Sequence, residues 1–167
     1  DTVLSRGLGD VYKRQGVDNI DIDYATSKGI IVMNTPHGNS ITTAEHTIAM
    51  IMSLARQIPD ANVSTKKGKW EKSKFVGTEI TGKKLGLIGC GNIGSIVVDR
   101  AKGLKMNVQV YDPFLTDDKS KELGIEKVSF ENLLGSSDII SIHTPLTDST
   151  RNIINSDNIY SIKKGAS

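Results

Sequence analysis

The sequence predicts an α/β fold in which helices cover both faces of a doubly wound parallel sheet. Short apolar runs alternate with segments of helical length from about residue 84 onward. Neighbouring parallel strands need such long crossovers between them, and these connections are right-handed in nearly all known cases. Gly103 and Gly124 directly follow two of the helical segments, at the position where helices commonly end.

The first expected elements precede this alternation. Residues 19–29, "NIDIDYATSKG", predict a short helix that ends at Gly29, and residues 30–34, "IIVMN", predict a buried strand. Residues 35–40, "TPHGNS", are rich in turn-forming residues and predict a loop.

A long helix is expected next. Thr42 and Glu45 have the spacing of a capping box at its start. Small and aliphatic residues then recur at helical spacing and predict one apolar stripe, made of Ala44, Ile48, Ile51 and Ala55. Pro59 is expected to bend or restart this helix.

The alternation itself predicts four strands and four helices. In chain order they are a strand over 85–89, a helix over 92–102, a strand over 108–111, a helix over 117–123, a strand near 128, a helix over 130–134, a strand over 139–142 and a helix over 157–163.

Composition narrows the classes of protein. The 167 residues hold 21 Lys and Arg against 19 Asp and Glu, a net charge of +2, so no charge excess favours nucleic acid or an anionic membrane. The single cysteine can close no internal disulfide, which suits a reducing compartment and predicts the cytoplasm. No apolar run approaches the roughly 20 residues of a membrane helix.

The first 15 residues have neither helical nor strand periodicity and predict a tail. Residues 5–15, "SRGLGDVYKRQ", resemble a transposon-type sequencing adaptor translated in frame. We therefore expect residues 1–15 to be non-native and the natural sequence to start at Gly16.

A glycine motif carries the first chemical signal. Gly89, Gly91 and Gly94 form a G-x-G-x-x-G pattern directly after an apolar strand and at the start of a helix, which predicts a Rossmann-type dinucleotide site. The first glycine permits the tight turn, the second lets a pyrophosphate approach the backbone, and the third lets helix and strand pack closely. Amides near Asn92 and Ile93 would present positive dipole to phosphate.

Asp112 strengthens this interpretation. It ends the next strand, at about the 20-residue distance expected for a carboxylate that binds a ribose 2′-hydroxyl. Because the carboxylate would repel a 2′-phosphate, the sequence predicts NAD rather than NADP as cofactor. The alternative is an ordinary glycine turn with a surface aspartate. Cys90, inside the motif, is expected to be a small buried filler.

A second candidate site follows the strand over 139–142. His143, Thr144 and Pro145 lie at a carboxyl end of the sheet, where open α/β folds bind ligands, and all three are predicted to contact the cofactor. His143 as a general base stays a weaker alternative, since no carboxylate partner is visible. Thr147 and Thr150 are expected to order the following turn.

The other two histidines, His37 and His46, are expected to be structural or solvent-facing. Neither has metal-ligand spacing with cysteine or carboxylates, so the sequence predicts no metal site.

These motifs together resemble the D-isomer-specific 2-hydroxyacid dehydrogenases. The resemblance covers the chain after the tail and rests on "GVDNID", "NTP", "AEHTIA", "GCGNIG", "YDP" and "HTPLT". It implies a NAD-dependent oxidoreductase that passes hydride between C2 of a D-2-hydroxy acid and NAD. It also implies a homodimer or homotetramer, with the stripe of the long helix at a two-fold interface.

The resemblance also implies a domain division. Residues 16–40 would be what remains of a substrate domain, 41–78 crossing and dimerisation helices with an interdomain segment, and 79–167 a truncated NAD domain. The family's catalytic Arg, Glu and His follow a segment like the "KKGAS" at residues 163–167. We therefore expect an internal fragment with no catalytic residue and no activity of its own.

Within the family, the branch that oxidises 3-phosphoglycerate in L-serine biosynthesis is the most similar. That assignment rests on residues 38–40 and on "GKWEKSKFVGTE", and it implies that Asn39 and Lys72 bind substrate. Lys72 stands where the branch often has Arg, and a lysine cannot bind phosphate bidentately. A solvated basic face is the alternative for this segment.

Two other functions stay open at this point. One is a glyoxylate/hydroxypyruvate reductase or a D-lactate dehydrogenase. The other is a non-enzymatic, NAD-sensing relative of the corepressor type, since a fold alone does not determine function.

Overall fold

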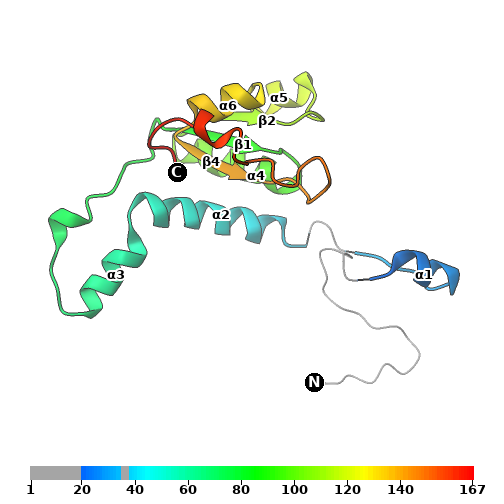
Figure 1. Ribbon diagram of the computed structural model, residues 1–167, viewed down its shortest axis with the longest axis horizontal. Coiled ribbons are helices and arrows are strands. Elements are labelled where there is room, and N and C mark those ends of the chain that lie inside the picture. The colour runs from blue at the N-terminus through cyan, green and yellow to red at the C-terminus, as the bar shows by residue number, and fades with distance from the viewer. Residues whose placement is uncertain (1–19, 35–37) are drawn as a thin grey trace. The chain divides into compact units, whose positions relative to one another are not determined.

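The computed structural model describes residues 20–34 and 38–167 (Figure 1). The expected tail, its adaptor-like segment, the start at Gly16 and His37 lie outside the described residues. The chain divides into two compact units, Asp1–Ser40 and Ile41–Ser167. The domain division expected from the sequence stays a prediction.

The first unit contains one helix, α1 (Ile22–Ser27), among its described residues. Asp21 caps it by accepting from the amide of Tyr24 at 2.9 Å. Gly29 has a φ of +68° just past the helix end, as a left-handed terminating residue requires. The predicted short helix is confirmed.

The predicted buried strand over 30–34 is wrong. These residues have no strand structure, and Ile31 and Met33 are 82% and 83% exposed. A strand exists only where its amides and carbonyls pair with a neighbour. In the described part of the chain no strand pairs with this segment, so its apolar composition alone does not make it a strand.

The second unit begins with two helices, α2 (Ser40–Ala55) and α3 (Ile58–Lys66). Because α2 starts at Ser40, Thr42 lies inside the helix and the predicted capping box is misplaced. Pro59 lies in the first turn of α3, as predicted, and Gln57 between the helices adopts the left-handed conformation with a φ of +52°. The crossing segment that follows holds one short 3₁₀ helix, η1 (Lys72–Lys74).

Four parallel strands form the sheet, in the order β3-β2-β1-β4. The strands and their connecting helices are β1 (Lys84–Ile88), α4 (Asn92–Gly103), β2 (Asn107–Tyr111), α5 (Asp117–Leu123), β3 (Glu126–Lys127), α6 (Phe130–Ser136) and β4 (Ile139–Ile142). The chain moves outward from β1 to β3 and then returns to the other side of β1. Ligands bind at such a reversal of strand order in open α/β sheets.

The two faces of the sheet bury different clusters. Leu87 of β1 packs with residues of α2 and α4, whereas its neighbour Ile88 packs with Leu133 and Leu134 of α6. Successive strand residues point to opposite faces, so helices cover both. The predicted doubly wound α/β fold is confirmed.

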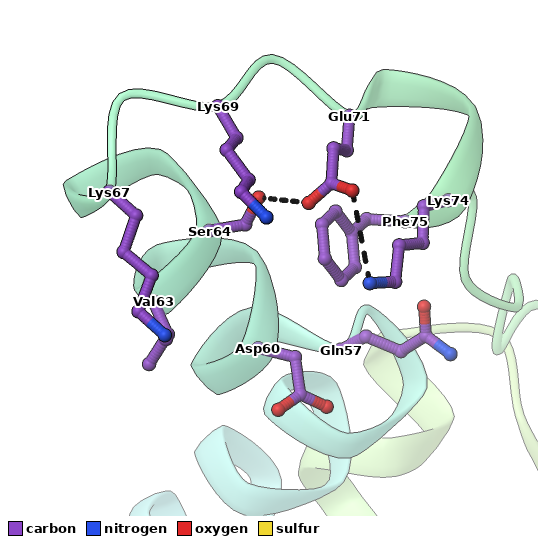
Figure 2. A pocket seen from close by; sticks show the side chains of 9 residues that line it. All are labelled: Gln57, Asp60, Val63, Ser64, Lys67, Lys69, Glu71, Lys74 and Phe75. Carbon is purple, nitrogen blue, oxygen red and sulfur yellow. Dashed lines mark hydrogen bonds and ion pairs between the residues drawn. The ribbon is translucent and has the colours of Figure 1, made fainter.

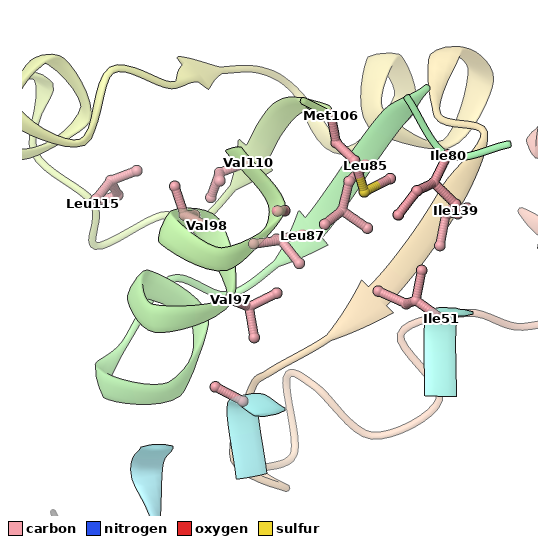
Figure 3. Packing of buried hydrophobic residues seen from close by; sticks show 12 residues of the cluster. Ile51, Ile80, Leu85, Leu87, Val97, Val98, Met106, Val110, Leu115 and Ile139 are labelled. Atoms are coloured by element: carbon pink, nitrogen blue, oxygen red, sulfur yellow. The ribbon is translucent and has the colours of Figure 1, made fainter. Parts of the chain in front are cut away.

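The stripe of α2 belongs to the first of these clusters. Ala44 and Ile51 are buried in it, and Ile48 and Ala55 pack against it. Figure 3 shows Ile51 directed toward Ile139 of β4. The stripe is therefore an intramolecular core face, and its expected place at a two-fold interface is wrong.

The predicted helix over 157–163 is also wrong. Only the 3₁₀ turn η2 (Ile159–Ser161) forms there. Asn155 and Asn158 bind nearby backbone instead, since Asn158 Oδ1 accepts from the amide of Asn155 and Asn158 Nδ2 donates to the carbonyl of Ile153. Short polar side chains compete in this way with helical hydrogen bonds.

No helix within residues 20–34 and 38–167 has the length and apolar character needed to cross a membrane.

Candidate functional site

The turn from β1 into α4 depends on Gly89. This residue has a φ of +95°, which side chains rarely tolerate. A Cβ on it would lie 2.8 Å from the carbonyl oxygen of His143 and 2.9 Å from Cγ2 of Thr144. Glycine is required here twice, for the turn and for the close approach of the segment that follows β4.

Gly94 and Gly91 have different surroundings. A Cβ on Gly94 would lie 2.6 Å from the carbonyl oxygen of Gly89, so this glycine lets α4 pack against the end of β1. A Cβ on Gly91 would meet nothing within 4 Å. The missing side chain at Gly91 therefore leaves open space over the backbone of the turn.

The N-terminus of α4 borders this space. Gly91 is its N-cap, and no side chain caps the helix there. Asn92 is exposed and Ile93 half-buried, and the first amides of a helix have no partner within it. Uncapped amides beside an open glycine are what a pyrophosphate requires, so these residues fit a dinucleotide.

Asp112 follows β2 and binds the glycine turn directly. Its Oδ2 accepts from the amide of Cys90 at 2.7 Å, and its Oδ1 accepts from the amide of Phe114 at 2.8 Å. A carboxylate offers about four acceptor positions, so two remain for a ligand's hydroxyl groups. The carboxylate thus joins the end of β2 to the turn after β1.

His143 follows β4 on the other side of β1. Its amide donates to the carbonyl of Ile88 at 2.8 Å, and its Nε2 lies 2.9 Å from Oγ of Ser141. Burial lowers the pKa of the imidazole below its ordinary value, which favours the neutral ring at pH 7. No carboxylate among the described residues bonds this ring, so its pairing is not that of a catalytic base held by an acid.

The residues after His143 form an ordered turn. Thr144 is half-buried and Pro145 exposed. Oγ1 of Thr150 accepts from the amide of Thr147 at 2.8 Å and donates to the carbonyl of Pro145 at 2.6 Å. The predicted role of the two later threonines in ordering this turn is confirmed.

Cys90 is half-buried inside the turn. Burial raises the pKa of its thiol, and the charge of Asp112 adds to the effect, so the thiol stays protonated at neutral pH. A protonated thiol is a poor nucleophile, which agrees with its predicted filler role. Within the described part of the chain no group of His, Cys, Asp and Glu residues could hold a metal ion.

The basic segment lies elsewhere in the second unit. A pocket of about 390 Å³ lies between α3 and η1. Figure 2 shows Lys69 and Lys74 near Glu71, with Lys67 farther away on the lining of the pocket. Oγ of Ser64 donates to Glu71 at 2.6 Å and fixes that carboxylate. Lys72 is exposed and does not line this pocket.

The two residues predicted to bind substrate belong to different units. Asn39 lies in a turn of the first unit, and Lys72 lies in η1 of the second. Their assignment stays a prediction.

The cofactor residues predicted from the sequence come from three chain segments at the carboxyl ends of β1, β2 and β4. The structure brings these segments into contact through the Cys90–Asp112 hydrogen bond and the approach of His143 to Gly89. Their contacts with a cofactor stay predictions. Sequence reasoning missed Ser141, although the two-residue period of a strand places it on the same side of β4 as His143.

Comparison with known families gives one match. Residues 48–167 match the model described as "D-isomer specific 2-hydroxyacid dehydrogenase, NAD binding domain". This range contains the glycine turn, Asp112 and the segment after β4.

Curated relatives and solved structures agree with that match. The chain is 52% identical over 150 residues to D-3-phosphoglycerate dehydrogenase of Bacillus subtilis (strain 168), covering 90% of this chain and 29% of the relative. It is 48% identical to that of Archaeoglobus fulgidus, covering 90% and 28%. It also resembles D-lactate dehydrogenase from Aquifex aeolicus, complexed with NAD and lactic acid, with a TM-score of 0.78, 36% identity and coverage of 92% and 46%. The chain thus spans less than a third of the length of these curated relatives.

Proposed function

Because residues 48–167 match the NAD-binding domain of the D-isomer specific 2-hydroxyacid dehydrogenases, the chain belongs to that family, and we propose that it provides the cofactor cleft of a NAD-dependent oxidoreductase. The observation that carries the proposal is the open cradle at Gly91. There, uncapped amides of α4, a glycine at which a Cβ would meet nothing within 4 Å, and the carboxylate of Asp112 surround one turn.

Each part of the cradle has its own task. The amides of Asn92 and Ile93 hold the pyrophosphate, and Asp112 accepts from the ribose hydroxyls. His143, Thr144 and Pro145 border the cofactor from the side of β4. Bound NAD supplies the acceptor for the hydride that leaves C2 of a D-2-hydroxy acid. The residues of this chain bind and orient that cofactor and carry no step of the chemistry.

The substrate in this proposal is 3-phosphoglycerate, which is oxidised to 3-phosphohydroxypyruvate for L-serine biosynthesis. The support is the 52% identity to a relative named D-3-phosphoglycerate dehydrogenase, against 36% identity to the D-lactate dehydrogenase structure. Asn39 and Lys72 are the proposed substrate contacts, with Lys72 as a point charge for the phosphate.

Assembly and location complete the proposal. A homodimer or homotetramer in the cytoplasm is expected from the family resemblance. Since the stripe of α2 is covered, a dimer contact on this helix would have to use its other face. Away from the stripe, the helix exposes Met50 and Leu54, which are 57% and 58% accessible.

The test is a titration of the 167-residue chain with NAD and with NADP. We expect tighter binding of NAD, because the carboxylate of Asp112 accepts from a ribose diol and repels a 2′-phosphate. Asp112→Ala should weaken NAD binding about 10- to 100-fold, since a hydrogen bond to a charged group contributes about 1.5–3 kcal/mol.

The matched control is Asp118→Ala, in the first turn of α5 and exposed. This variant should bind NAD like the wild type. Equal affinity for both dinucleotides, or an Asp112→Ala variant with unchanged NAD affinity, would remove the proposed role of Asp112.

A further inference from the structure

A serine on β4 contacts the histidine that borders the cofactor cleft. Ser141 is the third residue of the strand, and His143 comes two residues later, on the same side. Oγ of Ser141 lies 2.9 Å from Nε2 of His143, so the imidazole folds back along the strand. Both side chains are partly buried.

The backbone of His143 is held against the glycine turn. Its amide donates to the carbonyl of Ile88. Its own carbonyl oxygen lies 2.8 Å from the position that a Cβ of Gly89 would take, which is too close for a side chain there. Cβ of His143 also lies 3.8 Å from the position of a Cβ on Gly94. Cβ of His143 therefore lies beside the glycine turn. The side-chain rotamer then determines whether the ring points over this turn or away from it.

Within the described residues, no other hydrogen bond or ion pair reaches this ring. The bond with Ser141 is the polar contact that the structure gives the imidazole. A neutral imidazole donates at one nitrogen and accepts at the other. A serine hydroxyl can donate to Nε2 or accept from it, so this bond fixes the direction of the ring and not its tautomer.

We propose that Ser141 is a positioning residue of the NAD site, whose hydroxyl holds the imidazole of His143 along β4 in one orientation. The role rests on the proposed function. With the ring held back, the turn at Gly89 and Gly91 stays open to a dinucleotide. Without the hydroxyl, the ring samples other rotamers above the turn and has to be ordered again when the cofactor binds.

The best test uses two variants that have nearly the same shape but differ in the hydroxyl. Ser141→Thr keeps the donor and acceptor, whereas Ser141→Val replaces it with a methyl group, and both β-branched residues suit a strand. Ser141→Ala is the third variant. The control is Ser156→Ala, an exposed serine that bonds Asp157 outside the cleft.

The first measurement is a nitrogen-15 spectrum of the His143 ring in the full 167-residue chain. We expect the same Nε2 resonance in the wild type and in Ser141→Thr, because both keep the hydrogen bond to a hydroxyl, and a displaced Nε2 resonance in Ser141→Val and Ser141→Ala, which lose it. The second measurement is NAD affinity, which should fall about threefold to tenfold in Ser141→Val and Ser141→Ala, as expected for one hydrogen bond. Ser141→Thr and Ser156→Ala should bind like the wild type.

Three results would overturn the proposal. One is a ring spectrum in Ser141→Val and Ser141→Ala that equals the wild type, and another is unchanged NAD affinity in both. The third is a wild-type chain that binds no NAD, which removes the proposed function together with the role of Ser141. In the second case the wild type still binds NAD, so only the positioning role fails.

Discussion

Two glycines of one motif are required for different physical reasons. Gly89 has a positive φ, and the carbonyl of His143 fills the place of its side chain. Gly91 has a negative φ of −75° and open space where a Cβ would be. The folded chain itself requires a glycine at position 89. At position 91 the fold would accept a side chain, and the glycine serves the proposed cofactor.

Alanine substitutions separate the two requirements. Gly89→Ala should destabilise the protein by about 1–3 kcal/mol or more, because it combines backbone strain with a clash. Gly91→Ala should leave the free energy of unfolding nearly unchanged and weaken NAD binding at least tenfold. Urea denaturation and NAD titration of both variants measure this. A Gly91→Ala variant that binds NAD normally would contradict the placement of the pyrophosphate.

Asp138 makes folding stability depend on pH. Nζ of Lys163 donates to its Oδ1 at 2.6 Å and the amide of Lys84 donates to its Oδ2 at 2.8 Å. These two bonds lower the pKa of the carboxyl below its ordinary value. Asp138 therefore binds a proton more readily in the unfolded chain than in the folded one. Its contribution to the free energy of unfolding is complete above the unfolded pKa and is lost as the pH falls through the folded pKa.

We therefore expect Asp138→Asn to reduce stability at pH 6 and to have much less effect at pH 3. Urea denaturation at both pH values measures the effect. Asp157→Asn, at an exposed position, is the control that separates the effect of Asp138 from that of other carboxyl groups. A variant that costs the same free energy at both values would show that Asp138 acts through packing and not through its charge.

At the scale of elements, one face of α2 is buried in the core and another is exposed to solvent. Ile51 is 7% exposed and lies in the cluster with β1, α4 and β4, whereas Leu54, three residues later, is 58% exposed. The two residues are close in size and hydrophobicity. Only the neighbours that tertiary packing provides distinguish them.

Ile51→Ala should lower the free energy of unfolding by about 2–4 kcal/mol, because it removes buried methyl groups and leaves a cavity. Leu54→Ala should change it by about 0.5 kcal/mol or less. Chemical denaturation at low protein concentration compares them. An equal cost for the two would mean that the outer face of α2 is also buried, as in an oligomer.

At the scale of the whole molecule, binding and catalysis are expected to separate. In the proposed function the cradle orients NAD, but oxidation of a hydroxy acid also needs a positioned base and a cation for the substrate carboxylate. Among the described histidines, the ring of His143 is bonded to Ser141, and His46 is exposed on α2. Neither imidazole bonds a carboxylate among the described residues.

The 167-residue chain should therefore bind NAD and form no NADH from 3-phosphoglycerate. Absence of the general base alone reduces a rate about 10²–10⁴-fold. Absorbance of NADH in the presence of excess chain and substrate measures this. Turnover that disappears in a His143→Ala variant would instead identify His143 as a base and contradict its assignment to the cofactor side.

Much of the fold follows from local sequence. The caps at Thr116 and Ser129 and the glycine after α5 lie within a few residues of the groups they bind, and the elements they bound were predicted closely. The glycine motif and Asp112 were recognised for the same reason, since each depends on its position relative to one strand. When both groups of a hydrogen bond lie within three or four residues of each other, the local sequence is enough to predict that bond.

The tertiary structure decided what depends on distant partners. Residues 30–34 have the composition of a strand, but no strand of the described sheet pairs with them, and the stripe of α2 is covered by this chain's own sheet. Gln109, a polar residue of β2, is buried because Ser136 and Ser137 bond its side chain. Gly86 leaves the space that Ser137 occupies. In each case the deciding group lies many residues away, and only the folded chain brings it into contact.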